Sequence, residues 1–132
     1  MVKRYKKGAR AERELAKILK EKGFSVVRSA GSGSNISTPD LVAIKRRNVF
    51  AFECKAWKRL PKLKEEEYKE FFRWCKNAGA SGFLAWKNRK WLFLDLNDIN
   101  KKNIKVCGLT LDELLRIMEG KIHENNNRVR HS

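Results

Sequence analysis

The sequence lacks the long apolar runs of membrane proteins and the paired cysteines of disulfide-rich or zinc-binding proteins. No segment of the chain approaches the roughly 20 apolar residues that a membrane-spanning helix needs, and no apolar stretch follows the basic N-terminus. The three cysteines, Cys54, Cys75 and Cys107, form no Cys-x-x-Cys pair and no Cys/His cluster. We therefore expect reduced thiols in a cytoplasmic protein, and neither secretion, membrane insertion nor a zinc site.

Acidic residues are scarce relative to basic ones. The chain has 15 Asp and Glu against 31 Lys and Arg, which gives a net charge of +16 on 132 residues. A small domain with this charge carries a strong positive field over part of its surface, so its natural partner is a polyanion. Nucleic acid is favoured over anionic lipid, because the bases are scattered instead of lining one amphipathic helix. The simpler alternative is a thermophile's Lys-rich surface, but such surfaces usually balance their charges.

Hydrophobic periodicity predicts three helices and about five strands in one α/β domain. Apolar residues at helical spacing indicate helices over residues 8–22, around 68–75 and over 111–121, the last preceded by a capping box of Thr110 and Glu113. Predicted strands cover residues 24–28, 40–44, 49–56, 82–87 and 91–95, with a further edge strand considered at 104–107. We expect a central mixed sheet flanked by helices within a single domain over 1–123, followed by a flexible basic tail at 124–132.

A cluster of polar residues is expected at one end of two predicted strands. Glu53 and Lys55 are two residues apart, so they project from the same face of a strand about 6.6 Å from each other, while Cys54 points into the core. A hairpin that turns at Arg46-Arg47 places Asp40 opposite Glu53, with their Cβ atoms roughly 5 Å apart. Two facing carboxylates repel unless a cation lies between them, and Mg²⁺ prefers such oxygen ligands. Lys55 could then orient or deprotonate a water that attacks a phosphodiester, or stabilise the charge that develops.

Glu12 and Arg28 are expected near the same cluster. Glu12 lies at the border of the inward helical stripe that contains Leu15 and Leu19, so an acid there needs a partner and could be a further metal ligand, direct or through water. Arg28 ends the predicted 24–28 strand and could hold a phosphate there. Each feature also has a simpler explanation. Glu-x-Lys on a strand is usually only a solvated alternation, Glu12 could pair with a base of the N-terminal segment, and Arg28 could be one more surface base.

The joint pattern of Pro39-Asp40 and Glu53-Cys54-Lys55 resembles the PD-(D/E)xK nuclease superfamily. More narrowly, the runs KGARAEREL at 7–15, GFSVVRSAGS at 23–32 and PDLVA at 39–43 are similar to the archaeal Holliday junction resolvases. The resemblance implies a restriction-endonuclease-like core and a homodimer that binds four-way DNA junctions by structure. It further implies paired symmetric nicks that depend on Mg²⁺ or Mn²⁺.

The resemblance also assigns roles to single residues. It implies metal binding by Glu12, Asp40 and Glu53, and a catalytic role for these three together with Lys55. The expected DNA-binding residues are Lys6, Lys7 and Arg10 of the basic N-terminal segment, Arg13 and Arg28 by the resemblance, and Ser32 in a loop that lies near the scissile strand in relatives. Glu67 stands where some relatives have Gln, so the resemblance gives it no role.

Other functions and the dimer contact stay open at this point. A restriction-like, nicking or repair nuclease on linear duplex would use the same core, and a non-catalytic basic DNA-binding protein would use the same charge. One site per chain cuts one strand, so an isologous dimer supplies the two sites that a junction needs. Candidates for that contact are Trp57, Phe72, Trp74 and Trp91, unless these aromatic residues belong to the core.

Overall fold

The computed structural model describes residues 2–29, 38–55, 64–99 and 108–131, with side chains from residue 9 to residue 127 of these ranges. Three helices and six strands lie within them. The elements are α1 (Val2–Glu21), β1 (Ser25–Arg28), β2 (Leu41–Lys45), β3 (Asn48–Lys55), α2 (Glu65–Ala78), β4 (Ala80–Asn88), β5 (Lys90–Asp95), a 3₁₀ turn (Leu96–Asp98), β6 (Leu109–Thr110) and α3 (Leu111–His131). Of the described helices, none is long and apolar enough to cross a membrane.

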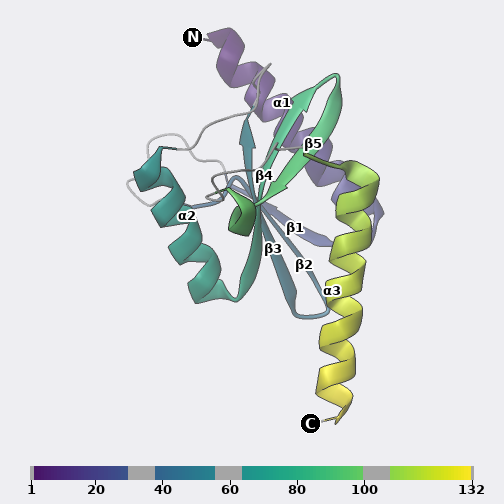
Figure 1. The fold of residues 1–132 in the computed structure, drawn as a ribbon. Helices are drawn as coiled ribbons and strands as arrows, with labels where there is room; N and C mark the ends of the chain where they lie inside the picture. The colour runs from purple at the N-terminus through teal and green to yellow at the C-terminus, as the bar shows by residue number, and fades with distance from the viewer. Residues whose placement is uncertain (1, 30–37, 56–63, 100–107, 132) are drawn as a thin grey trace.

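The six strands form one mixed sheet in the order β1-β2-β3-β4-β5-β6. Neighbouring strands are antiparallel except β3 and β4, which are parallel and are connected through α2. Figure 1 shows α2 on one side of the sheet, with α1 and α3 on the other. The predicted mixed sheet flanked by helices is therefore confirmed, with one more strand than expected. The edge strand considered at 104–107 lies outside the described residues, and the observed edge is β6.

Side chains of β3 alternate between the two faces of the sheet. Phe50 and Phe52 are buried in the larger core, against residues of α1 and α3 that include Leu15 and Met118. Ala51 points the other way and packs under α2. Because faces alternate along a strand, Glu53 and Lys55 continue the face of Ala51, at the end of β3 where α2 covers the sheet.

A glycine in β4 allows α2 to lie close to the sheet. A Cβ atom at Gly82 would lie 2.8 Å from the Cys75 sulfur and 2.9 Å from a methyl carbon of Leu96. Neither contact is sterically possible, so a side chain here would push α2 outward. The close approach fixes the height of α2, and of the side chains it carries, above the end of β3.

The β2–β3 hairpin has a two-residue turn with a left-handed backbone. Arg46 and Arg47 have φ values of 49° and 70°, as a type I′ turn requires. The buried Asn48 stabilises this conformation by donating from its amide nitrogen to the carbonyls of Lys45 at 3.2 Å and Arg46 at 3.0 Å. The resulting register pairs Lys45 with Asn48 and Leu41 with Phe52. This is the register that the sequence predicted for a turn at Arg46-Arg47.

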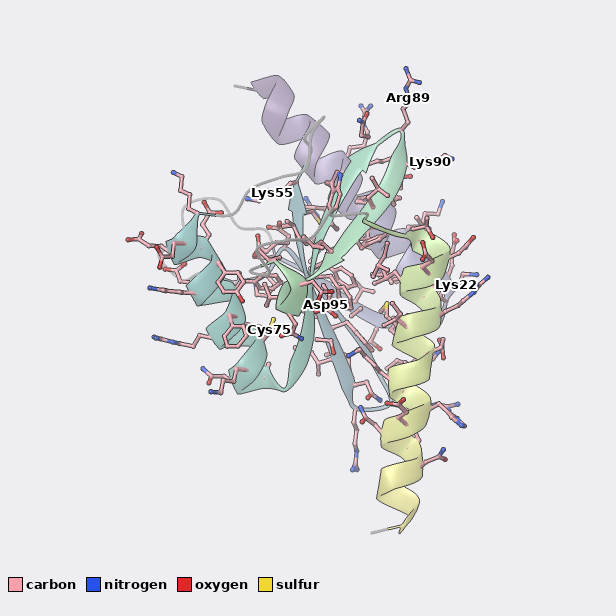
Figure 2. The ribbon with its side chains drawn as sticks, in the orientation of Figure 1. Lys22, Lys55, Cys75, Arg89, Lys90 and Asp95 are labelled. Carbon is pink, nitrogen blue, oxygen red and sulfur yellow. The ribbon has the colours of Figure 1, made fainter. Side chains whose placement is uncertain are left out.

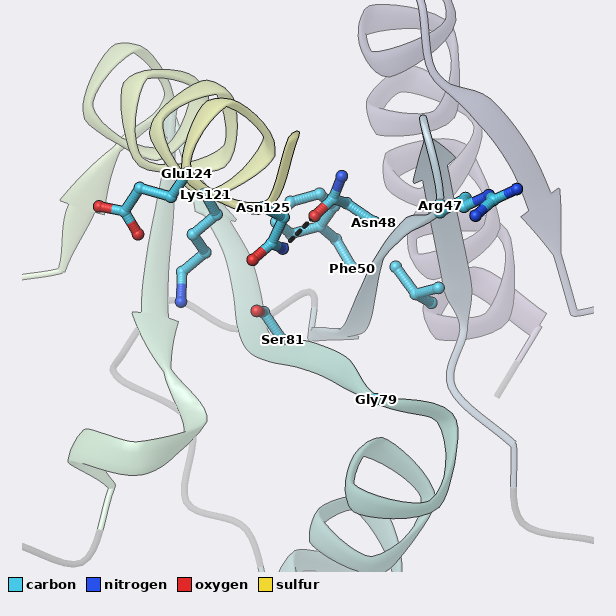
Figure 3. A pocket seen from close by; sticks show the side chains of 9 residues that line it. Arg47, Asn48, Phe50, Gly79, Ser81, Lys121, Glu124 and Asn125 are labelled. Atoms are coloured by element: carbon cyan, nitrogen blue, oxygen red, sulfur yellow. Dashed lines mark hydrogen bonds between the residues drawn. The ribbon is translucent and has the colours of Figure 1, made fainter. Parts of the chain in front are cut away.

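Two predicted helix boundaries were wrong. The first helix was expected at 8–22 but begins at Val2, because basic residues have good helix propensity and need no apolar stripe to continue a helix. The last helix was expected to end at 121, with an irregular tail at 124–132, but it runs to His131. Its extension is supported by Asn125, which donates a hydrogen bond to the Asn48 side chain at the start of β3 (Figure 3). The hydrophobic pattern of the sequence does not reveal such a tertiary contact.

The start of α3 agrees with the sequence. The Glu113 amide donates to the Thr110 hydroxyl at 3.2 Å, and the Thr110 amide donates to the Glu113 carboxylate at 3.1 Å. These two reciprocal bonds form the predicted capping box. The bond from the Thr110 N–H lowers the pKa of Glu113, because it favours the charged carboxylate. The capping-box prediction is confirmed.

We expect Asn48→Ala to lower the free energy of unfolding by about 1–3 kcal/mol, because it removes two hydrogen bonds to partly buried carbonyls and leaves Asn125 without its acceptor. Urea denaturation at neutral pH measures this loss. Asn125→Ala is the matched control, since it removes only one of the three bonds and its effect should be smaller. A stability of Asn48→Ala equal to that of the parent protein would contradict the structural role of Asn48.

Candidate active site

The hairpin brings Asp40 and Glu53 together at one end of the sheet. Asp40 directly precedes β2, and continuation of the β2–β3 register places it opposite Glu53. The two carboxyl groups share a side-chain hydrogen bond. Asp40 is fixed further because its Oδ2 accepts a hydrogen bond of 2.8 Å from the backbone N–H of Cys54. The carboxylate of Asp40 thus satisfies an N–H of β3 at the point where β2 begins.

Burial and mutual repulsion make this pair unusual electrostatically. Burial, and after it the negative charge of Asp40, raise the pKa of Glu53 to about 8. Burial also raises the pKa of Asp40, against the opposing effects of the Cys54 N–H and the Lys55 charge. Because the pKa of Glu53 is about 8 and its carboxyl group is hydrogen-bonded to that of Asp40, a proton lies between the two groups at neutral pH.

This pair fits a divalent cation. Two carboxylates on adjacent strands, one of them oriented by a backbone N–H, offer hard oxygen ligands, and a cation could replace the shared proton. Among the residues with described side chains, no group of three or more His, Cys, Asp and Glu is already arranged around a metal position. Within the described part of the chain, the pair could therefore supply two carboxylate ligands to such a cation.

Lys55 lies beside the pair and has an acidic partner of its own. Figure 2 shows Lys55 extending from the end of β3 on the side of α2. Its Nζ lies 3.5 Å from Oε2 of Glu67, in the first turn of α2. The negative charge of Glu67 also raises the pKa of Glu53. Sequence reasoning left Glu67 without a role, although an acidic run of three residues, Glu65–Glu67, at a helix start would have marked it.

Glu12 reaches the same end of the sheet from the opposite face. It belongs to α1, and its Oε2 accepts a hydrogen bond of 3.2 Å from Nε of Arg28. Burial raises the pKa of Glu12, and the negative charge of Asp40 contributes next, so the two carboxylates interact electrostatically. Glu12 thus lies near the Asp40–Glu53 pair, and its direct partner among the described side chains is Arg28.

Ser29 and Thr38, which flank the residues 30–37 that the structure does not describe, are hydrogen-bonded to each other, and Ser29 is also bonded to Asp40. The Ser29 amide donates to the carbonyl of Asp40 at 3.0 Å. The hydroxyls of Ser29 and Thr38 are also 3.0 Å apart, which joins the two ends of the segment. Ser32, predicted to contact DNA, lies outside the described residues.

The other residues predicted to bind DNA lie on α1. Arg10 and Arg13 are exposed, and Nε of Arg13 donates to the carbonyl of Ala9 at 3.2 Å. The backbone of Lys6 and Lys7 belongs to α1, and their side chains lie outside the described set. The structure therefore places two of the predicted cations on the exposed surface of the helix that carries Glu12.

The aromatic candidates for a dimer contact divide into core and surface. Trp91 is only 7% exposed and stacks on Phe93, so it belongs to the core, the alternative that the sequence left open. Trp74 is half-buried against the core under α2. Phe72 is 40% exposed and stacks on Tyr68, while Trp57 lies outside the described residues. Phe72 is the member of the set that presents an apolar surface to solvent.

A buried carboxyl pair beside a lysine, at the end of a mixed sheet with helices on both faces, defines an α/β nuclease. Comparison with known proteins gives the family. The family profile described as "Archaeal holliday junction resolvase (hjc)" matches residues 3–123. The chain belongs to the archaeal Holliday junction resolvase family.

Several characterised relatives cover most of the chain. The crossover junction endodeoxyribonuclease Hjc of Sulfolobus acidocaldarius is 35% identical over 134 residues, which cover 88% of this chain and 91% of that protein. The protein of the same name from Archaeoglobus fulgidus is 36% identical over 106 residues, covering 76% and 78%. A solved structure of Archaeoglobus fulgidus Hjc, a Holliday junction resolvase, aligns with a TM-score of 0.67 and 33% identity over 86% of this chain and 98% of that one. The predicted family and fold class are confirmed.

We expect the metal-free protein to lose stability as the pH rises from about 4.5 to about 8. Glu53 has its ordinary pKa of 4.5 in the unfolded chain and a pKa of about 8 in the folded protein, so unfolding in this window releases a proton. Stability from this group is complete below the lower value and lost as the pH passes the higher one. Urea denaturation in a chelator at several pH values measures the slope. Glu53→Gln should flatten it, whereas Glu119→Gln, on distant α3, should not. An unchanged slope in Glu53→Gln would contradict the assignment.

We expect Glu67→Gln to lower the pKa of Glu53, because it removes a negative charge that disfavours ionisation of that carboxyl. Carboxyl carbon chemical shifts followed by NMR against pH report this value directly. Glu66→Gln, one position away in the same helical turn, is the matched control. If both variants titrate like the parent protein, Glu67 does not interact with the pair.

Proposed function

We propose that this chain is a Mg²⁺-dependent endodeoxyribonuclease that resolves four-way DNA junctions by paired symmetric nicks. The observation that carries the proposal is the hydrogen-bonded Asp40–Glu53 pair with Lys55 beside it. Membership in the archaeal Holliday junction resolvase family supports it, as does the name of the relatives, crossover junction endodeoxyribonuclease. The net charge of +16 suits a DNA substrate.

Asp40 and Glu53 would hold the metal directly, and Glu12 would complete the set directly or through water. When bound, Mg²⁺, or Mn²⁺ in its place, supplies positive charge to the phosphate oxygens and makes water more acidic. Glu53 loses its proton in this exchange, because its pKa of about 8 reflects the lack of a compensating charge. Glu12 must exchange part of its contact with Arg28 for the new ligand position.

The cationic side chains of the site act on the phosphodiester. Lys55 projects from the same face of β3 as Glu53, so its ammonium can orient the attacking water or stabilise the charge that develops on the phosphate. Glu67 holds Lys55 in position through the 3.5 Å contact. Arg28, at the end of β1, can donate to an adjacent phosphate when Glu12 turns toward the metal. Arg13, one residue after Glu12, supplies a further cation on the same side.

A single site of this kind cuts one strand, so resolution requires two sites. We propose a homodimer, whose two-fold axis relates the sites as the exchanging strands of a junction are related. Each protomer contributes one nuclease domain that acts on DNA in the cytoplasm. The exposed Phe72 offers an apolar surface for the dimer contact.

The proposal is tested with a labelled four-way junction and a linear duplex of the same arm sequence, each with and without Mg²⁺. We expect paired symmetric nicks in the junction only, dependent on Mg²⁺. Glu53→Gln should abolish them, and Lys55→Ala should slow them by roughly 10²–10³-fold. Glu119→Gln is the matched carboxylate control, because Glu119 pairs with Lys45 away from the site.

Other outcomes lead to other functions. Cutting of linear duplex at the same rate would retain the nuclease and reject selectivity for junctions. Tight binding without cleavage in Mg²⁺ or Mn²⁺ would reject the enzyme and favour a DNA-binding protein. Equal activity of Glu53→Gln and the parent protein would show that the carboxyl pair is not the active site.

A further inference from the structure

A groove with cationic walls lies between α1 and β1, next to the carboxyl pair. Its lining residues are Arg13, Ala16, Lys17, Lys20, Val26 and Arg28. Those from α1 recur at the spacing i, i+3, i+4 and i+7, so they form one stripe along the helix. The stripe is about 10 Å long, at 1.5 Å per residue from Arg13 to Lys20. It begins beside Glu12 and Arg28 and continues away from the active site.

The groove contains positive charge that is not neutralised. None of its lining residues is acidic. Arg28 pairs with Glu12, and Arg13 gives one donor to the carbonyl of Ala9. Lys17 and Lys20 are exposed, and neither has an ion pair or hydrogen bond with another residue whose side chain the structure describes. Two free ammonium groups on one wall of a groove are suited to a repeating anion.

A second depression on the surface is less suited to binding an anion. It lies at the opposite end of β3 and contains Arg47 and Lys121 (Figure 3). Glu124 is also part of its wall, and both sides of the Asn48 amide are already hydrogen-bonded to the protein. That depression offers an anion fewer free donors than the groove beside α1.

We propose that the groove between α1 and β1 binds the phosphate backbone of the duplex arm that leaves the active site, with Lys17 and Lys20 as its contacts beyond Arg13 and Arg28. The inference rests on the proposed nuclease function, because it takes DNA as the ligand of the adjacent site. Phosphates of one strand follow one another every 3.4 Å along the duplex axis, so the stripe covers about three of them. Such contacts position the arm without reading its sequence, as recognition of a junction by structure requires.

The test compares two double variants of the full chain with equal loss of charge. Lys17→Gln/Lys20→Gln removes the groove contacts, and Lys76→Gln/Lys121→Gln removes two lysines at the other end of the sheet. Binding to a fluorescent four-way junction and to linear duplex is measured in EDTA from low to moderate salt, after thermal unfolding has shown that both variants fold. We expect the groove variant to bind at least about tenfold more weakly, with a salt slope smaller by about 2. The control should stay within about twofold of the parent protein.

The outcomes separate this proposal from the nuclease function. An unchanged salt slope in Lys17→Gln/Lys20→Gln, or an equal loss in the control, would overturn the groove as a DNA site even if the parent protein cuts junctions. A selective loss in the groove variant supports the groove even if the parent protein cuts no junction in Mg²⁺, and only the nuclease function would then fail.

Discussion

Two acidic side chains that share one proton at the end of a hairpin are the constraint around which this structure is organised. Asp40 and Glu53 face each other across β2 and β3, where most neighbours are apolar, so their charges cannot both be present without compensation. The protein supplies partial compensation through the Cys54 N–H and the charge of Lys55. Every other functional side chain is placed relative to this pair.

Two cations near the pair form ion pairs with carboxylates from different helices. Arg28 is paired with Glu12 of α1, and Lys55 with Glu67 of α2. A phosphate that enters the site therefore competes with a side chain instead of meeting a fully free cation. Pairing keeps both cations ordered, and since both pairs are partly exposed, exchange of partners has a low energetic cost. The site can thus be ordered without DNA and still open to it.

The structural features that depend on local residue spacing were predicted correctly from the sequence. The turn at Arg46-Arg47 and the alternation along β3 were sufficient to place Asp40 opposite Glu53, because a two-residue turn determines register. The family resemblance supplied the roles that spacing does not determine. Apolar periodicity likewise predicted the three helices, although not where the first begins or the last ends.

The sequence could not predict the contacts between side chains of different helices and strands. The Glu12–Arg28 pair joins α1 to β1, and the Lys55–Glu67 pair joins β3 to α2 at a height that depends on Gly82. The hydrogen bond between Asn48 and Asn125 joins residues far apart in the chain. It forms where α3 continues beyond the apolar residues that predicted the helix. Such pairs depend on packing angles and helix heights, which leave no regular period in the sequence.

The alternation along β3 has a consequence for how this site can evolve. A shift of one residue in the β2–β3 register would turn Glu53 and Lys55 toward α1 and α3 and bring Cys54 to the face of the carboxyl pair. Substitutions in the turn leave the register intact, whereas an insertion or deletion between Asp40 and Glu53 dismantles the site at once. The length of the chain between Asp40 and Glu53 is therefore constrained more strictly than the identity of the exposed residues in its turn.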